Sequence, residues 1–246
     1  MANVRRIIRD LKMLMEPERK TEGIFIKTVD EMVDMIYMML IGPKDTPYEG
    51  CFFFFTIDPT MQYNSKEVGQ ANVQYPYNPP KVLFYSYYSV RCHPNLYQPS
   101  HSGGGKVCLS ILGTWAGEPW GPCMNFLTIA QTILSILDTE PLRNEPGFNS
   151  GRDVRVKKYT ELIQYVCLKE SLEHVVLQSF TDDPANKFVK LFSEEIRDYY
   201  LNNKENYVNI ITKRAVEFDG KQITSSPYGC GYEGVFNYES LLGKII

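Results

Sequence analysis

Residues 93–115 read HPNLYQPSHSGGGKVCLSILGTW, in which a Gly-rich loop leads into Lys106 and Val107, and a single cysteine, Cys108, precedes an apolar run. Cys108 has three possible roles: a nucleophile, a metal ligand, or a small apolar residue of the core. The residue types around Cys108 limit these roles, and the sequence on either side predicts the fold that surrounds it.

The Gly-rich loop differs from a phosphate-binding loop at two positions. Such a loop needs a Gly six positions before its Lys and a Ser or Thr directly after it, because these residues cradle phosphate and Mg²⁺. Ser100 and Val107 occupy those positions here. The glycines therefore indicate a mobile loop with unusual backbone angles.

A metal site or a cysteine hydrolase also fits the stretch poorly. Cys92 and His93 are adjacent and point apart in an extended chain, whereas zinc ligands usually come in pairs two to four residues apart. A hydrolase needs a base beside its thiol. His93 or His101 is available as that base, but no Asn or Asp has an obvious position from which to orient it.

Thioester exchange is the chemistry that fits Cys108 best. When a substrate already carries a thioester, attack by a thiol is nearly isoenergetic, so a paired His is unnecessary. Such a site needs an accessible thiol in a groove, a neutral donor for the developing oxyanion, and a weak acid–base environment for an incoming amine. We therefore expect Cys108 to be exposed, with the donor supplied by His93-Pro94-Asn95.

The composition is typical of a soluble globular chain. Of 246 residues, 43% are hydrophobic and 22% are charged, and the formal net charge of −3 argues against nucleic acid as a partner. No apolar run reaches the roughly 18–20 residues that cross a membrane, and the N-terminus lacks the apolar segment of a signal peptide. The six cysteines form no C-x-x-C pair, which indicates reduced thiols in a cytosolic or nuclear protein.

The pattern of residues 4–15 predicts an amphipathic helix with an apolar stripe and a basic side. The basic side is either a solvated face or a docking surface for an acidic partner. The stripe comprises Val4, Ile7, Ile8, Leu11 and Met15, and the basic side carries Arg5, Arg9 and Lys12.

Four strands and a long helix are predicted after this first helix. Apolar or β-branched runs at 23–29, 32–42, 51–57 and 81–88 indicate an antiparallel sheet, with a hairpin connection at 42–50. Residues 126–140 are apolar on nearly every side, which favours a helix packed against the sheet. From residue 153 onward the pattern is helical. The predicted class is α+β, with a core at 1–150 and a helical C-terminal extension at 151–246 packed on it.

Six motifs in chain order resemble those of the ubiquitin-conjugating (E2) enzymes, and their order is far more specific than any one of them. They are the basic leading helix; Gly42-Pro43 with Thr46-Pro47-Tyr48-Glu49-Gly50; Tyr75-Pro76-Tyr77-Asn78-Pro79-Pro80-Lys81; His93-Pro94-Asn95; Gly105-Lys106-Val107-Cys108-Leu109; and Trp120-Gly121-Pro122. CLSILGTW at 108–115, NEPGF at 144–148, FNYESLL at 236–242 and the C-terminal extension are most similar to the large Z-type members. The resemblance implies the UBC fold.

The resemblance also implies an activity. Cys108 would accept ubiquitin or a ubiquitin-like protein as a thioester from an activating enzyme, then pass it to a substrate lysine, directly or with a ligase. No cofactor is expected, because the activating enzyme uses the ATP. The expected partners are the modifier, the activating enzyme, ligases and substrate proteins, with no nucleic acid and no membrane, and the chain is expected to be a monomer. The alternative is a non-catalytic E2-like adaptor that binds ubiquitin or a ligase, and the presence of Cys108 argues against it.

Three further catalytic positions follow from the resemblance. Asn95 matches a side-chain amide that stabilises the oxyanion, or that orders the loop through hydrogen bonds. His93 is expected to order the turn and not to move protons. Glu145 matches an acidic residue that helps an incoming lysine lose its proton, or is a surface carboxylate near a helix end.

Two binding surfaces are implied as well, and no metal ligand is expected. The face of the first helix that meets the activating enzyme is matched by Arg5, Arg6, Arg9 and Lys12. Two loops that ligases grip are matched by Tyr77, Pro79, Trp120 and Pro122. Aromatic and proline side chains suit a shallow hydrophobic anchor, although Tyr77 and Trp120 would also serve to cap the sheet.

Three departures from the family pattern lie near Cys108. Cys108 follows Asn95 by thirteen residues, more than is usual in the family, so the loop at 96–105 is longer and Gly-rich. Ser110 stands where the family usually has Asp. Residues 115–119 lengthen the loop before Trp120, which weakens the match with the ligase-binding loops.

Overall fold

The computed structural model describes residues 4–29, 35–61, 75–99, 103–149, 151–223, 226–228 and 234–245. The chain forms two compact units. The first unit comprises Met1–Ile41, Phe53–Ser86 and His93–Leu137, and the second comprises Gly42–Phe52, Tyr87–Cys92 and Asp138–Ile246. The C-terminal extension thus shares a unit with two short segments from the first half of the chain. The division into a core and an extension at residue 150 stays a prediction.

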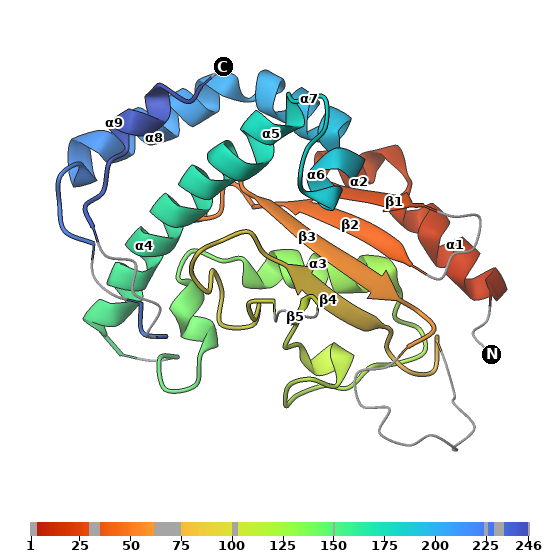
Figure 1. Cartoon of the computed structure of the whole chain (residues 1–246). Helices are drawn as coiled ribbons and strands as arrows, with labels where there is room; N and C mark the ends of the chain where they lie inside the picture. The colour runs from red at the N-terminus through yellow and green to blue at the C-terminus, as the bar shows by residue number, and fades with distance from the viewer. Residues whose placement is uncertain are drawn as a thin grey trace. The chain divides into compact units, whose positions relative to one another are not determined.

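The described strands form one sheet in the order β1-β2-β3-β4-β5, so that neighbours in sequence are neighbours in the sheet (Figure 1). The strands are β1 (Ile24–Thr28), β2 (Ile36–Ile41), β3 (Phe52–Asp58), β4 (Lys81–Tyr85) and β5 (Gly105–Lys106). β1 pairs with β2, β3 with β4, and β4 with β5 in antiparallel fashion. Each of the four predicted strands is confirmed, with β3 extending one residue past its predicted run, to Asp58.

The fifth strand corrects the expectation of four strands, because it lies in the segment that was expected to be a loop. Gly105 pairs with Phe84, and Lys106 pairs with Leu83. A Cβ atom on Gly105 would lie 1.8 Å from the carbonyl oxygen of Tyr97, so only glycine permits the two backbones to approach this closely. β5 therefore fixes the backbone at a sheet edge directly before Cys108.

The first helix is confirmed, but its buried face differs from the predicted stripe. α1 (Val4–Leu14) packs on α3 and β1, and buries Ile7, Asp10, Leu11 and Leu14. Val4, Ile8 and Met15 of the predicted stripe are exposed. A carboxylate is tolerated on the inner face because Arg6 and Tyr75 both donate hydrogen bonds to Asp10.

The described part of the first unit also contains the α-helices α2 (Pro17–Thr21) and α3 (Phe126–Ile136) and the 3₁₀ turn η1 (Ser110–Leu112). α3 begins in a capping box: Oδ1 of Asn125 accepts from the Thr128 N–H at 2.9 Å, and Oγ1 of Thr128 accepts from the Asn125 N–H at 3.3 Å. The predicted helix is confirmed from its start, but it ends at Ile136 and not at residue 140.

The second unit is mostly helical, as the sequence predicts. Its helices are η2 (Pro141–Asn144), α4 (Val154–Ser171), η3 (Leu172–Val176), α5 (Leu177–Ser179), α6 (Lys187–Leu191), α7 (Ser193–Asn202), α8 (Lys204–Phe218) and α9 (Glu239–Leu242). η2 is a 3₁₀ turn, and η3 is a π-helical turn that continues α4. In the described part of the chain, no helix has the length and apolar character needed to cross a membrane.

Side chains of these helices fix the segment at 42–52. The Tyr207 hydroxyl of α8 donates to the carbonyl oxygen of Gly50 at 2.5 Å. Nδ2 of Asn206 donates to Oε1 of Glu49 at 2.8 Å. In α4, Oγ of Ser171 accepts from the N–H of Phe52 at 3.3 Å. The helical extension therefore contributes to the core of its unit and is not an independent appendage.

Candidate active site

Cys108 and Asn95 are joined by two hydrogen bonds. The N–H of Cys108 donates to the carbonyl oxygen of Asn95 at 2.8 Å, and Nδ2 of Asn95 donates to the carbonyl oxygen of Cys108 at 2.7 Å. Beside this pair, Leu96 forms isolated bridges with Val107 and with His93. The structure therefore brings together the predicted nucleophile and the predicted oxyanion donor, although thirteen positions separate them in sequence.

Thr114 supports the backbone on both sides of Cys108. Its Oγ1 donates to the carbonyl oxygen of Val107 at 2.6 Å and accepts from the N–H of Leu109 at 2.9 Å. Between them, the 3₁₀ turn η1 (Ser110–Leu112) reverses the chain and ends at Gly113 in the left-handed region, φ 65°. These contacts fix the main chain of Cys108 from both directions.

The expectation that the thiol is exposed is wrong for this structure, because only 2% of Cys108 is accessible. The physical reason lies in the residues around it. Val107, Leu109 and Leu112 are all buried, and the segment lies against Asn95 by backbone hydrogen bonds. Cys108 is therefore buried together with these apolar neighbours. The predicted role of Cys108 as an acceptor would require its Sγ to reach the surface, where this structure does not place it.

The Asn95 side chain occupies a position compatible with both of its predicted roles. It is 8% exposed, and its amide group has two N–H bonds, of which the hydrogen bond to Cys108 uses one. That bond orders the loop directly. The second N–H is the group that the predicted oxyanion role would use.

His93 acts on the backbone of the turn. Its Nδ1 accepts a hydrogen bond from the N–H of Asn95 at 3.0 Å, so the proton of the neutral ring is on Nε2. The residue is completely buried. This geometry fits the expectation that His93 orders the turn. Among the described residues, no group of three His, Cys, Asp or Glu side chains could hold a metal ion.

Glu145 lies in the second unit, directly after η2. Its N–H donates to the carbonyl oxygen of Leu142 at 3.0 Å, and its own carbonyl oxygen accepts from the N–H of Phe148 at 3.1 Å. Arg143 holds the following turn by donating to the carbonyl oxygens of Phe148 and Gly151, at 3.0 and 2.9 Å. The carboxylate is half-buried, and its Oε2 accepts from the hydroxyl of Tyr228 at 2.7 Å.

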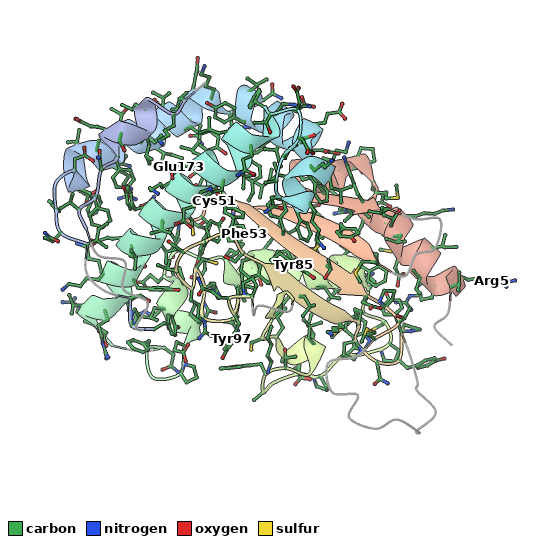
Figure 2. The ribbon with its side chains drawn as sticks, viewed as in Figure 1. Arg5, Cys51, Phe53, Tyr85, Tyr97 and Glu173 are labelled. Atoms are coloured by element: carbon green, nitrogen blue, oxygen red, sulfur yellow. The ribbon has the colours of Figure 1, made fainter. Side chains whose placement is uncertain are left out.

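The four basic residues of α1 fall into two groups. Arg5, Arg9 and Lys12 are exposed, and Arg5 points away from its helix (Figure 2). Arg6 differs from the expectation, since only 14% of its side chain is exposed. Its guanidinium donates to Asp10 at 2.5 Å and to the carbonyl oxygens of Pro122 and Met124, at 3.0 and 2.8 Å. Arg6 therefore ties α1 to the loop before α3 and is not part of an open basic face.

The predicted ligase-binding residues all lie in the first unit and differ in exposure. Tyr77 is 64% exposed, Pro122 is exposed, and Pro79 is half-buried. Nε1 of Trp120 donates to the carbonyl oxygen of Pro76 at 2.7 Å. Trp120 therefore joins the two predicted loops to each other, whereas Tyr77 and Pro122 offer the apolar surface.

Two residues of these sites were not predicted from the sequence. Thr114 was quoted within the motif that contains Cys108, but its hydroxyl bonds depend on the turn at 110–113. Tyr228 is 83 positions from Glu145, in a segment that only appeared Gly- and Tyr-rich. No local pattern links a residue of the tail to a residue near the end of a helix, so only the fold reveals this contact.

Comparisons with known proteins agree with the sequence motifs. The family model for ubiquitin-conjugating enzymes matches residues 6–166. Ubiquitin-conjugating enzyme E2 Z of Xenopus tropicalis is 29% identical over 245 residues, which are 98% of this chain and 69% of that protein. The protein of the same name from Homo sapiens is 31% identical over 229 residues, 91% of this chain and 56% of that protein. The chain thus spans little more than half of the human relative.

A narrower match to a curated protein bears the same enzyme name, and one similar solved structure is also found. The human dual E2 ubiquitin-conjugating enzyme/E3 ubiquitin-protein ligase BIRC6 is 37% identical over 144 residues, 55% of this chain and 3% of that protein. A crystal structure of a ubiquitin-conjugating enzyme E2 from Plasmodium falciparum covers 56% of this chain and 84% of its own, at 20% identity and a TM-score of 0.40. The family match includes Cys108, Asn95 and Glu145. The chain therefore belongs to the ubiquitin-conjugating enzyme family, as a Z-type member with the α+β UBC fold.

Proposed function

We propose that this chain accepts ubiquitin, or a ubiquitin-like protein, as a thioester on Cys108 and transfers it to a lysine. In loading, the Cys108 thiol gives up its proton, its sulfur attacks the thioester carbonyl on the activating enzyme, and the activating enzyme's thiolate leaves. In transfer, the lysine amine attacks the new thioester, a C–N bond forms and the C–S bond breaks. The lysine ammonium loses two protons in all: one goes to the Cys108 sulfur and regenerates the thiol, and the other passes from its first acceptor to solvent.

The observation that supports this function is the pairing of Cys108 with Asn95 inside the region matched by the family model. We assign the second N–H of the Asn95 amide to the oxyanion, in addition to its bond with the Cys108 carbonyl. We assign the orientation of Asn95 to His93, whose Nδ1 holds the Asn95 N–H. We assign to Glu145 the role of first acceptor for the proton of the incoming amine.

Family membership implies ubiquitin, an activating enzyme and ligases as partners. For the activating enzyme, we propose the exposed face of Arg5, Arg9 and Lys12, with Arg6 supporting that face from within. For ligases, we propose Tyr77 and Pro122, with Trp120 holding their two loops together and Pro79 shaping one of them. The cysteine usage supports the cytoplasm or the nucleus as the compartment.

A loading assay tests the proposed function. The full chain is incubated with activating enzyme, modifier and ATP, and is then run on a gel without reductant. We expect a band shifted by one modifier, removed by thiol reductant, absent in Cys108→Ala and retained in Cys123→Ala, whose thiol is exposed. A wild-type chain that binds modifier but never forms this band would instead be the E2-like adaptor. Repeating the assay with different activating enzymes and modifiers identifies the matching pair.

A discharge assay tests the role of Glu145. We expect Glu145→Ala to load at the rate of the wild type and to lose its thioester to free lysine more slowly, because the amine then lacks its first proton acceptor. The measurement follows loaded enzyme over time after ATP is removed. Equal slowing of loading and discharge would show that Glu145 has no specific part in transfer.

A further inference from the structure

The Glu145 carboxylate has a hydrogen-bond donor from the C-terminal tail. The Tyr228 hydroxyl donates to Oε2 of Glu145 at 2.7 Å, and both residues belong to the second unit. The backbone of Glu145 is fixed by the turns around η2, as described above. A glutamate side chain nevertheless retains several rotatable bonds, so a fixed backbone does not fix the carboxylate. In the described part of the chain, the bond from Tyr228 is what orders it.

Tyr228 is itself held by two neighbours in the same unit. The guanidinium carbon of Arg91 lies 4.5 Å from the centre of the Tyr228 ring, within the range of a cation–π contact. The Tyr159 ring meets it edge-on, with centroids 5.8 Å apart and an interplanar angle of 74°. The hydroxyl of Tyr159 donates to the carbonyl oxygen of Arg91 at 2.7 Å, which closes the group. The contacts with Arg91 and Tyr159 therefore fix the Tyr228 ring, and its hydroxyl is directed at Glu145.

We propose that Tyr228 is a positioning residue for transfer, which holds the Glu145 carboxylate in the orientation that accepts a proton from the incoming lysine. The inference rests on the proposed function of Glu145. The hydroxyl donates a hydrogen bond and gives up no proton, so one carboxylate oxygen is occupied by Tyr228 and the other is left to the amine. The C-terminal extension thereby contributes to the acid–base part of the reaction, and not only to the packing of its unit.

A double-mutant cycle tests this inference on the full chain. Wild type, Tyr228→Phe, Glu145→Ala and the double variant are each loaded with the modifier, ATP is removed, and the loss of thioester is followed over a range of lysine concentrations. Tyr228→Phe keeps the ring that contacts Arg91 and Tyr159, and removes only the hydroxyl. We expect it to load normally and to discharge about ten-fold more slowly, the size expected for one hydrogen bond to a charged group.

The cycle separates positioning from a general structural effect. We expect Tyr228→Phe to change nothing further when Glu145 is already Ala, because the hydroxyl acts through that carboxylate. We also expect Tyr228→Phe to lower the maximal discharge rate. The lysine concentration that gives half of the maximal rate is expected to stay unchanged. Tyr207→Phe is the matched control, since it removes a hydroxyl bond to Gly50 in the same unit without touching Glu145. It is expected to discharge like the wild type.

Each other outcome overturns the inference in an identifiable way. Normal discharge by Glu145→Ala removes the proposed role of Glu145, and with it the role of Tyr228. Slow discharge by Glu145→Ala with normal discharge by Tyr228→Phe removes the inference alone. Equal slowing by Tyr228→Phe in both backgrounds, or an effect on the half-maximal lysine concentration only, shows that the tyrosine acts on the fold or on lysine binding instead of through Glu145.

Discussion

The described cysteines lie in environments that predict very different reactivity. Alkylation needs an accessible thiolate, so both burial and the pKa of the thiol control its rate. Burial raises the pKa of the Cys51 and Cys167 thiols, because desolvation disfavours the thiolate. Cys108 is 2% exposed, whereas Cys123 is exposed at the surface. The residue assigned to catalysis is therefore not the thiol that a small reagent meets first.

We expect N-ethylmaleimide at limiting concentration to modify Cys123 well before Cys108 in the folded chain. The reason is access, since the Cys108 sulfur must first reach the surface. Peptide mass spectrometry after timed quenching gives the two rates, and a Cys230→Ser variant removes the cysteine that lies outside the described residues. Modification of Cys108 as fast as that of Cys123 would show that the thiol is open in solution.

At this scale, the sequence predicted which residues meet but not how deeply they lie. The resemblance implied that Asn95 serves Cys108 as a hydrogen-bond donor, and the structure places the two residues side by side. Exposure was not predictable, since it depends on the surrounding apolar side chains and on the hydrogen bonds of Thr114, which form only in the folded turn. The contact of Tyr228 with Glu145 was not predictable either, because it also forms only in the folded chain.

Among the elements, α1 carries a buried charged residue, Asp10, on the face that packs inward. Asp10 is fully buried on the inner face, where it accepts from Arg6, from Arg9 at 3.3 Å and from the Tyr75 hydroxyl. Desolvation disfavours the charge on Arg6, but its bond and charge interaction with Asp10 outweigh this, so the pKa of Arg6 is raised. The ion pair within α1 orients the Arg6 guanidinium, whose bonds to the carbonyl oxygens of Pro122, Cys123 and Met124 hold α1 against the loop before α3.

We expect Arg6→Ala to lower the free energy of unfolding by about 3 kcal/mol, because it removes the nearest cation from the buried Asp10 carboxylate and leaves only the exposed Arg9 and the Tyr75 hydroxyl beside it. Urea unfolding followed by circular dichroism measures the change. Arg9→Ala is the matched control: its side chain is 64% exposed and 3.3 Å from the same carboxylate, so less than about 1 kcal/mol is expected. Similar losses in both variants would contradict the assignment of Arg6 to the interior.

The elements themselves were largely predictable, and the exceptions have physical causes. Strong periodicity predicted α1, α3 and the four longer strands, because alternating or helical apolar patterns can be recognised within a short stretch of sequence. β5 was missed because two residues in a Gly-rich segment have no strand propensity, and it exists only because Gly105 fits against Tyr97. The predicted buried face of α1 was wrong because a hydrophobic stripe cannot anticipate a buried carboxylate that is paired with Arg6 of the same helix and with the distant Tyr75.

For the whole molecule, the second unit shows that residues 151–246 and earlier segments depend on each other. Five side chains of the extension bond to segments 42–52 and 87–92. These are Tyr159 to Arg91, Glu170 to Ser89, Ser171 to Phe52, Asn206 to Glu49 and Tyr207 to Gly50. The sequence lacked a linker and so predicted packing of the extension, but it could not predict which segments the extension would enclose.

A chain that ends at residue 150 is therefore expected to lose its cooperative thermal unfolding. Its segments at 42–52 and 87–92 would keep buried backbone groups without the partners that now satisfy them, and each such loss costs about 1–3 kcal/mol. A chain that ends at residue 220 is the control, because it keeps α4 to α8 and all five of these side chains. We expect the control to retain a cooperative transition at a reduced Tm, since the buried Phe236, Tyr238 and Leu241 are removed. If the 150-residue chain instead unfolds cooperatively at the Tm of the full chain, the segments at 42–52 and 87–92 do not need the extension, and residue 150 is a true domain boundary.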